Sequence, residues 1–173
     1  MKVKAGITGV VLTGLLAAAV FLDFMPRAAQ APDVTFTTIT GKQIELKALR
    51  GKPVIVTFWA TDCPNCIQEI PNLIELYDRY HPEGLEIIAV TMYYDPPSHV
   101  VAMTRDKLMP YDVALDLKAE HARAFGDVRL TPAHFVIAPD GRLVMDKVGV
   151  FELPDMKMLI ESLLKEAVAQ SDV

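Results

Sequence analysis

Two cysteines, Cys63 and Cys66, stand only three positions apart in this 173-residue chain, and it contains no others. They follow an apolar, β-branched run, residues 53–60, that predicts a buried strand, and they precede a run with helical periodicity, residues 64–80. A sulfur at a helix N-terminus is stabilised as a thiolate by the helix dipole and by unpaired N–H groups. A second sulfur about one turn later is close enough to form a disulfide with the first. The pattern therefore predicts a dithiol–disulfide redox centre.

A purely structural disulfide is the weaker interpretation of this pair, because a bridge across two residues removes little chain entropy. The redox-active disulfide needs no separate cofactor, and we expect none. The four histidines have no metal-like spacing, and the eight methionines form no cluster with cysteine or histidine. The histidines are His81, His99, His121 and His134. We expect His134 to be a satisfied core or surface histidine.

The N-terminal segment has the pattern of an export signal. Lys2 and Lys4 precede an uncharged apolar run of 18 residues, 5–22. This length is near the lower end of a membrane span. We expect residues 1–25 to be a retained signal-anchor, with the basic end inside and the remainder of the chain outside.

Cleavage of the signal is the alternative, and it would leave a soluble periplasmic protein. Residues 29–31 resemble a small-x-small cleavage site, but Pro32 would follow the cut and disfavours it. With a retained anchor, residues 26–33 form a linker and residues 34–173 form the domain. Without residues 1–31 the net charge is −7, from 14 basic and 21 acidic residues, which argues against a nucleic-acid partner.

The remaining pattern predicts one α/β domain with a mixed sheet and helices on both sides. Two short strands around Thr40-Gly41-Lys42 read as an N-terminal hairpin, and Pro139-Asp140-Gly141 predicts a second turn between strands. The expected strands are residues 34–39, 43–46, 53–60, 85–92, 113–115, 133–138 and 142–145, and the expected helices are residues 64–80, 98–108, 118–125 and 153–169.

Over residues 33–169 the chain resembles the thioredoxin superfamily, and more narrowly the membrane-anchored TlpA/ResA-type thiol–disulfide oxidoreductases of the bacterial cell envelope. The resemblance rests on residues 51–60, on the Cys-Pro-Asn-Cys motif, on Glu69-Ile70-Pro71, and on Leu130-Thr131-Pro132 before a strand. It implies a thioredoxin-like fold with an extra N-terminal β-hairpin.

The resemblance also assigns roles. It implies that Cys63 is the attacking thiol and Cys66 the resolving thiol. Pro132 matches the family's cis-proline, which exposes the backbone of Thr131 so that a substrate segment can pair with it as an added strand. Glu69 matches a family glutamate one helical turn from Cys66, where a partly buried carboxylate can take the Cys66 proton.

Two departures from the family pattern affect the expected chemistry. Asp62 stands where the family usually has tryptophan, so a carboxylate opposes thiolate formation at the first cysteine and an apolar platform for partners is missing. Thr57 stands where thioredoxins have a buried aspartate, which leaves Glu69 as the expected proton carrier. The pair between the cysteines, Pro64 and Asn65, is expected to tune the redox potential.

These features predict an extracytoplasmic reductase of protein disulfides, re-reduced by a membrane electron donor of the thiol-transfer type. The resemblance implies apocytochrome c or copper-site cysteines as substrates. Two alternatives remain: the same chemistry run as a disulfide oxidase or isomerase, and a thioredoxin-fold chaperone that binds copper or a partner. A peroxidase is excluded, because Val56 and Ala60 occupy the positions of the proline and the hydroxyl residue that peroxiredoxins need before the cysteine.

Overall fold

The computed structural model describes residues 29–171. The expected signal-anchor, residues 1–25, lies outside the described residues. No helix within residues 29–171 has both the length and the apolar character that crossing a bilayer requires.

The elements follow the predicted order along the chain, with two short 3₁₀ segments added. The strands are β1 (Thr35–Thr37), β2 (Gln43–Glu45), β3 (Val54–Trp59), β4 (Glu86–Thr91), β5 (Asp112–Leu115), β6 (Ala133–Ile137) and β7 (Leu143–Val148). The helices are α2 (Pro64–Tyr80), α3 (Pro97–Asp106), α4 (Glu120–Ala124) and α5 (Leu153–Ser171), and the 3₁₀ segments are η1 (Leu46–Leu49) and η2 (His81–Glu83).

The central sheet is mixed, as predicted, with the strand order β5-β4-β3-β6-β7. Strands β3, β4 and β5 run parallel, whereas β6 pairs antiparallel with both β3 and β7. Strands β1 and β2 form a separate antiparallel hairpin. The expected thioredoxin-like α/β fold with an extra N-terminal hairpin is confirmed.

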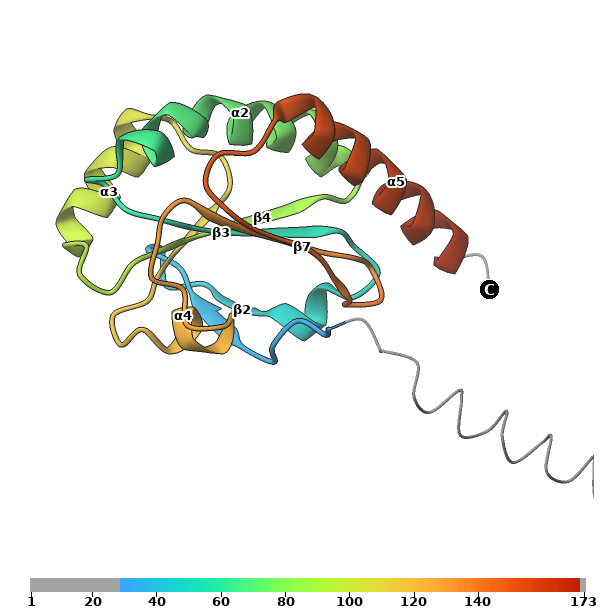
Figure 1. The fold of residues 1–173 in the computed structure, drawn as a ribbon, viewed down its shortest axis with the longest axis horizontal. Helices are drawn as coiled ribbons and strands as arrows, with labels where there is room; N and C mark the ends of the chain where they lie inside the picture. The colour runs from blue at the N-terminus through green and yellow to red at the C-terminus, as the bar shows by residue number, and fades with distance from the viewer. Residues whose placement is uncertain (1–28, 172–173) are drawn as a thin grey trace, which may run out of the picture.

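Helices and hairpin cover opposite faces of this sheet. Helices α2 and α5 lie over one face, and α4 and the β1–β2 hairpin lie against the other (Figure 1). Side chains of β3 alternate between these faces, because successive residues of a strand point in opposite directions. Thr57 and Trp59 therefore point toward α2, while Val56 and Phe58 point toward the hairpin side. Every residue of β3 is buried, as its apolar sequence predicts.

Helix α2 begins where the cysteine motif predicts. Cys63 is its N-cap and Pro64 occupies its first turn, where proline's missing N–H leaves no partner unsatisfied. The helix continues through Pro71 to Tyr80.

Several expected boundaries were wrong: β1 and α3 end two residues earlier than expected, and the ends of β7 and α4 also differ. Strand β7 extends to Val148, beyond the expected end at Met145, because its backbone stays paired with β6 while the outer face of this edge strand meets solvent. Because exposed and half-buried residues alternate along such a strand, its sequence contains no continuous apolar run that would predict its end. Helix α4 is shorter than expected, because Asp116 accepts the N–H groups of His121 and Ala122 and so fixes the start of the helix.

Candidate functional site

The two cysteines form a disulfide at the N-terminus of α2, with their Cα atoms 5.3 Å apart. The backbone N–H of Cys66 donates a hydrogen bond to the Cys63 sulfur at 3.2 Å. Cys63 is half-buried, whereas Cys66 is only 3% exposed. Of the two sulfurs, that of Cys63 is therefore the one that a partner protein can reach.

The loop before the disulfide is held by a buried carboxylate that sequence reasoning missed. Asp95, in the loop after β4, accepts the Thr61 N–H at 2.7 Å and the Thr61 hydroxyl at 2.6 Å. Asp95 is 5% exposed, and these two bonds join the loop before Cys63 to the end of the neighbouring strand. The sequence gives no signal that Asp95 has a partner 34 residues away.

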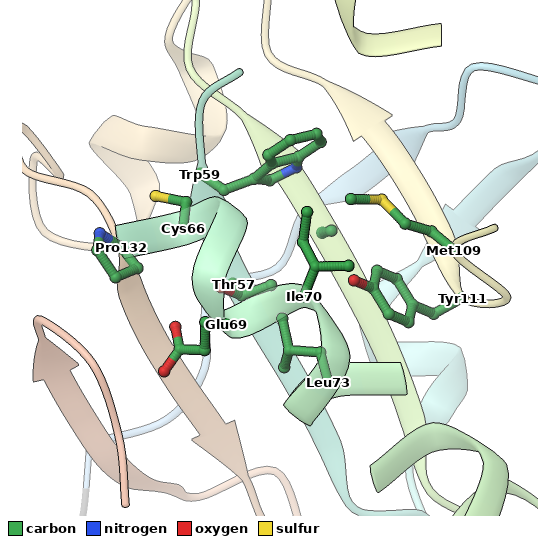
Figure 2. Close-up of a pocket in the computed structure, with 10 residues that line it drawn as sticks. Thr57, Trp59, Cys66, Glu69, Ile70, Leu73, Met109, Tyr111 and Pro132 are labelled. Atoms are coloured by element: carbon green, nitrogen blue, oxygen red, sulfur yellow. The ribbon is translucent and has the colours of Figure 1, made fainter. Parts of the chain in front are cut away.

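The predicted cis peptide is present between Thr131 and Pro132. Pro132 lines a small cavity together with Cys66, and Figure 2 shows the Cys66 sulfur on the side of α2 that faces this proline. The Pro132 carbonyl accepts the N–H of Gly149, in the segment after β7, at 2.8 Å. The structure thus brings together Cys63, Cys66 and the Thr131–Pro132 corner, as the sequence predicted.

Glu69 is more deeply buried than expected. Its side chain is almost fully enclosed, and the residue is 2% exposed. One carboxyl oxygen accepts the backbone N–H of Phe151 at 2.8 Å. The other lies 2.9 Å from Nε2 of His134. Glu69 also lines the cavity shared by Cys66 and Pro132 (Figure 2), so its carboxyl group is enclosed in the site and does not face bulk water.

His134 was expected to be an ordinary core or surface histidine, and the structure places it fully buried against Glu69. Its Nδ1 lies 3.0 Å from the hydroxyl of Thr57, the residue directly opposite it in the β3–β6 register. Its ring also meets the Phe151 ring edge-on, with centroids 5.0 Å apart. The contact between His134 and Thr57 arises from the pairing of β3 with β6, and neither strand's sequence alone predicts it.

The cavity beneath the disulfide is narrow and largely apolar. Its volume is ≈ 10 Å³, about the room that one water molecule needs. The buried Trp59 side chain packs in its wall. Tyr111 also lines it; burial raises the pKa of the Tyr111 hydroxyl, and the nearby Glu69 raises it further, so this phenol stays protonated.

The outer surface of the site carries aromatic rings beside Asp62. Asp62, Pro64 and Asn65 are exposed. The neighbouring Tyr94 is 49% exposed, and its ring meets that of Tyr93 edge-on at 5.4 Å. Burial raises the pKa of Tyr94, as does the charge of Asp62, while a hydrogen bond with the Thr131 side chain acts in the opposite direction.

A copper-binding chaperone would need metal ligands in addition to the two cysteines, and the described part of the chain offers no cluster of them. Between residues 29 and 171 no group of three or more His, Cys, Asp and Glu side chains could hold a metal ion. The two sulfurs form a disulfide with each other, and thiol–disulfide exchange through such a pair proceeds without a cofactor.

The comparisons with known proteins agree with this geometry. Residues 28–145 match the model of the AhpC/TSA family. The thiol-disulfide oxidoreductase ResA of Bacillus thuringiensis subsp. konkukian (strain 97-27) is 34% identical over 120 residues, covering 69% of this chain and 68% of the relative. ResA of Bacillus subtilis (strain 168) is 30% identical over 127 residues, covering 73% and 70%.

A solved structure supports the same assignment. The thiol:disulfide interchange protein of the thioredoxin family from Chlorobium tepidum TLS superposes with a TM-score of 0.74 at 26% identity, covering 81% of this chain and 99% of that one. The fold, the disulfide at the start of α2 and these relatives identify the catalysed chemistry as thiol–disulfide exchange. The chain therefore belongs to the AhpC/TSA family, as a thiol–disulfide oxidoreductase of the ResA/TlpA type whose redox-active disulfide is Cys63–Cys66.

Proposed function

We propose that the protein works outside the cytoplasm as a reductase of disulfides in partner proteins. The observation that carries this proposal is the asymmetry of the disulfide: the Cys63 sulfur is accessible at a helix N-terminus, and the Cys66 sulfur is buried behind it. Such a pair accepts a partner on the outer sulfur and releases it from the inner one.

In the reduced protein the Cys63 thiolate attacks one sulfur of the partner disulfide, and the other partner sulfur leaves as a thiolate. Cys66 then loses its proton and attacks Cys63. The Cys63–Cys66 bond forms, the bond from Cys63 to the partner breaks, and the second partner sulfur leaves and takes up a proton. The partner gains two electrons and the cysteine pair loses two. A membrane electron donor of the thiol-transfer type then restores the dithiol.

Glu69 is the proposed acceptor of the Cys66 proton. It follows Cys66 by three residues on α2, so the two side chains lie on the same helical face, and both line the cavity. The buried thiol has little contact with bulk water, so a nearby base is needed. The Phe151 N–H leaves one Glu69 oxygen facing His134, and the cavity has room for a single bridging water.

Thr131 and Pro132 are the proposed docking edge for an extended segment of the partner. Their corner lies beside Cys66, and the exposed Leu130 precedes it. Asp62 removes the apolar platform that the family usually has before the first cysteine, and Tyr94 supplies an aromatic surface close to it. We propose that Asp62, Pro64 and Asn65 tune the disulfide and the choice of partner.

The proposed setting is the bacterial cell envelope, with residues 1–25 as a retained anchor, residues 26–33 as a linker, and the domain of residues 34–173 facing the periplasm or cell exterior. The proposed substrates are cysteine pairs that must be reduced before they bind a group, such as those of apocytochrome c or of copper sites. The sequence resemblance supports both.

The redox potential tests the direction of transfer. The full-length protein is equilibrated with dithiol and disulfide buffers of defined ratio, and the fraction of Cys63–Cys66 disulfide is measured. A potential near or below roughly −270 mV, as in thioredoxin, is expected of a reductase. A potential near roughly −120 mV, as in a strong oxidant, would show that the protein forms disulfides and would overturn the proposed direction.

A further inference from the structure

The contact between His134 and Glu69 constrains where protons lie in the interior. Nε2 of His134 and a Glu69 carboxyl oxygen are 2.9 Å apart, an ion-pair distance, although the ring N–H does not point at that oxygen closely enough for an aligned hydrogen bond. A neutral imidazole nitrogen and a carboxylate oxygen that both presented lone pairs at this distance would repel each other. One of the two atoms must therefore carry a proton.

Burial favours the ionised form of this pair over an isolated carboxylate. His134 is completely enclosed and Glu69 nearly so. A buried carboxylate without a cation is costly, whereas an adjacent imidazolium offsets much of that cost. The Thr57 hydroxyl is neutral, so it can accept the Nδ1–H of the imidazolium without competing for its charge.

Other groups packed around the pair do not replace this cation. On the α2 side lie the two cysteines of the disulfide, and before β5 lies Tyr111, whose raised pKa keeps it neutral. On β7 the cross-strand neighbour of His134 is Lys147, which is half-buried and lies one strand further from β3. The contact to the Glu69 carboxylate itself comes from His134.

We propose that His134 is a positioning residue that keeps Glu69 ionised and oriented, so that Glu69 can take the proton of Cys66 in the resolving step. The inference rests on the proposed role of Glu69 and extends it. When the Cys66 proton moves to the carboxylate, the negative charge moves from Glu69 to the Cys66 sulfur, and the imidazolium of His134 keeps its proton. The cluster's net charge is unchanged, so no charge enters or leaves the buried site.

The proposal predicts what replacing His134 does. In His134→Gln the amide retains a polar contact to Glu69 but supplies no positive charge. Without that charge, burial disfavours the ionised carboxylate that the resolving step uses, so this step is expected to require a higher pH. Attack by Cys63, which lies at the more accessible end of the site, has no such dependence on His134.

The two steps can be followed separately with an aromatic disulfide of thionitrobenzoate as the probe. Reaction with the reduced full-length protein releases one coloured thiolate when Cys63 attacks and a second when Cys66 attacks. In stopped-flow measurements from pH 5 to 9, His134→Gln is expected to raise the pH midpoint of the second phase by about one unit, a tenfold slowing on the acid side. The first phase is expected to keep its profile.

Three comparisons make the result decisive. His121→Gln is the matched control, because His121 is a histidine on α4, against the opposite face of the sheet, and it should leave both phases unchanged. Glu69→Gln should abolish the pH-dependent limb of the second phase, and adding His134→Gln to that variant should change nothing further. Thr57→Val should shift the midpoint in the same direction as His134→Gln but less, and it serves if His134→Gln fails to fold.

The outcomes separate the two ideas. An unchanged second phase in Glu69→Gln would refute the role of Glu69, and the inference about His134 would fail with it. A normal effect of Glu69→Gln, combined with no midpoint shift in His134→Gln or Thr57→Val, would overturn the inference about His134 alone. A uniform slowing of the second phase at every pH in the His134 variant would also overturn it, because that pattern indicates a structural role.

Discussion

The two faces of the central sheet are built from the same strands but have different chemical character. On the face covered by the hairpin and α4, β3 and β6 present apolar side chains, and the rings of Phe58, Phe125 and Phe135 meet with centroids 4.9 to 5.8 Å apart. On the face covered by α2 and α5, the same two strands present Thr57 and His134. These two side chains contact each other, and His134 contacts Glu69.

The difference follows from the period of two along each strand. His134 and Phe135 are adjacent in sequence, yet one joins the proton-handling cluster and the other joins the aromatic core. The face under α2 and α5 therefore holds a costly buried polar cluster within an apolar core of its own, while the hairpin face contributes apolar burial alone. We infer that changes on the hairpin face affect stability without altering the redox chemistry, and the predictions below compare the two faces.

Replacing the cysteines should have the largest effect on chemistry. Cys63→Ser is expected to abolish reduction of partner disulfides, because the attacking thiolate is lost. Cys66→Ser is expected to accumulate mixed disulfides at Cys63, detectable by non-reducing electrophoresis and mass spectrometry. The domain should stay folded in both variants, since each change replaces one sulfur by oxygen and leaves the rest of both apolar clusters in place. If trapping occurred in Cys63→Ser instead, the two roles would have to be exchanged.

Removing a ring from the aromatic face should reverse this pattern. Phe135→Ala is expected to lower the free energy of unfolding by about 3–5 kcal/mol, through lost burial and an unfilled cavity. Urea denaturation measures the loss. The redox potential of the folded fraction should be unchanged, because Phe135 points away from the disulfide. A shift of the potential larger than about 30 mV, roughly 1.4 kcal/mol for this two-electron couple, would show that the faces are coupled.

On the hairpin side, a histidine should make the stability of the domain, but not its catalysis, depend on pH. Burial lowers the pKa of His121, which packs 4.7 Å from the Phe36 ring, although Asp116 and Glu120 oppose the shift. The folded protein therefore binds this proton less tightly than the unfolded chain. The resulting stability is present above about pH 6.5 and is lost as the pH falls below it toward the lowered pKa.

The His121→Gln variant should remove that component, so its melting temperature should fall less than that of the unmodified protein between pH 7 and pH 5. Parallel thermal scans across this range provide the measurement. Equal losses in both proteins would mean that other groups account for the acid sensitivity.

Changing the exposed charge beside Cys63 should have the smallest effect. Asp62→Trp removes a carboxylate that opposes the thiolate, so the titration midpoint of the Cys63 thiol is expected to fall by a few tenths of a pH unit, since an exposed charge is well screened. Absorbance of the thiolate at 240 nm follows the titration, and Asp62→Asn separates the effect of charge from that of the new ring. A midpoint that does not fall in either variant would remove Asp62 from the electrostatics of the site.

Much of the site was predictable because its signals are local. The spacing of Cys63 and Cys66, the apolar run before them and the proline at the first helical position specify a sulfur at a helix start, and the structure has this arrangement. The order of strands and helices was also correct. Several element ends were not, among them those of α4 and β7, because the backbone N–H groups that Asp116 accepts and an edge strand exposed on one side leave no apolar pattern.

The sequence alone determined the redox pair, the thioredoxin-like order of elements and the glutamate one helical turn beyond Cys66. The tertiary structure alone decided that Asp95 holds the loop before Cys63, that Phe151 donates to Glu69, and that His134 faces that carboxylate. These contacts join residues 34, 82 and 65 positions apart, respectively. Local propensity acts over a few residues, whereas such partners meet only after β3 has paired with β6 and α2 has packed on the sheet, so their sequence positions carry no trace of one another.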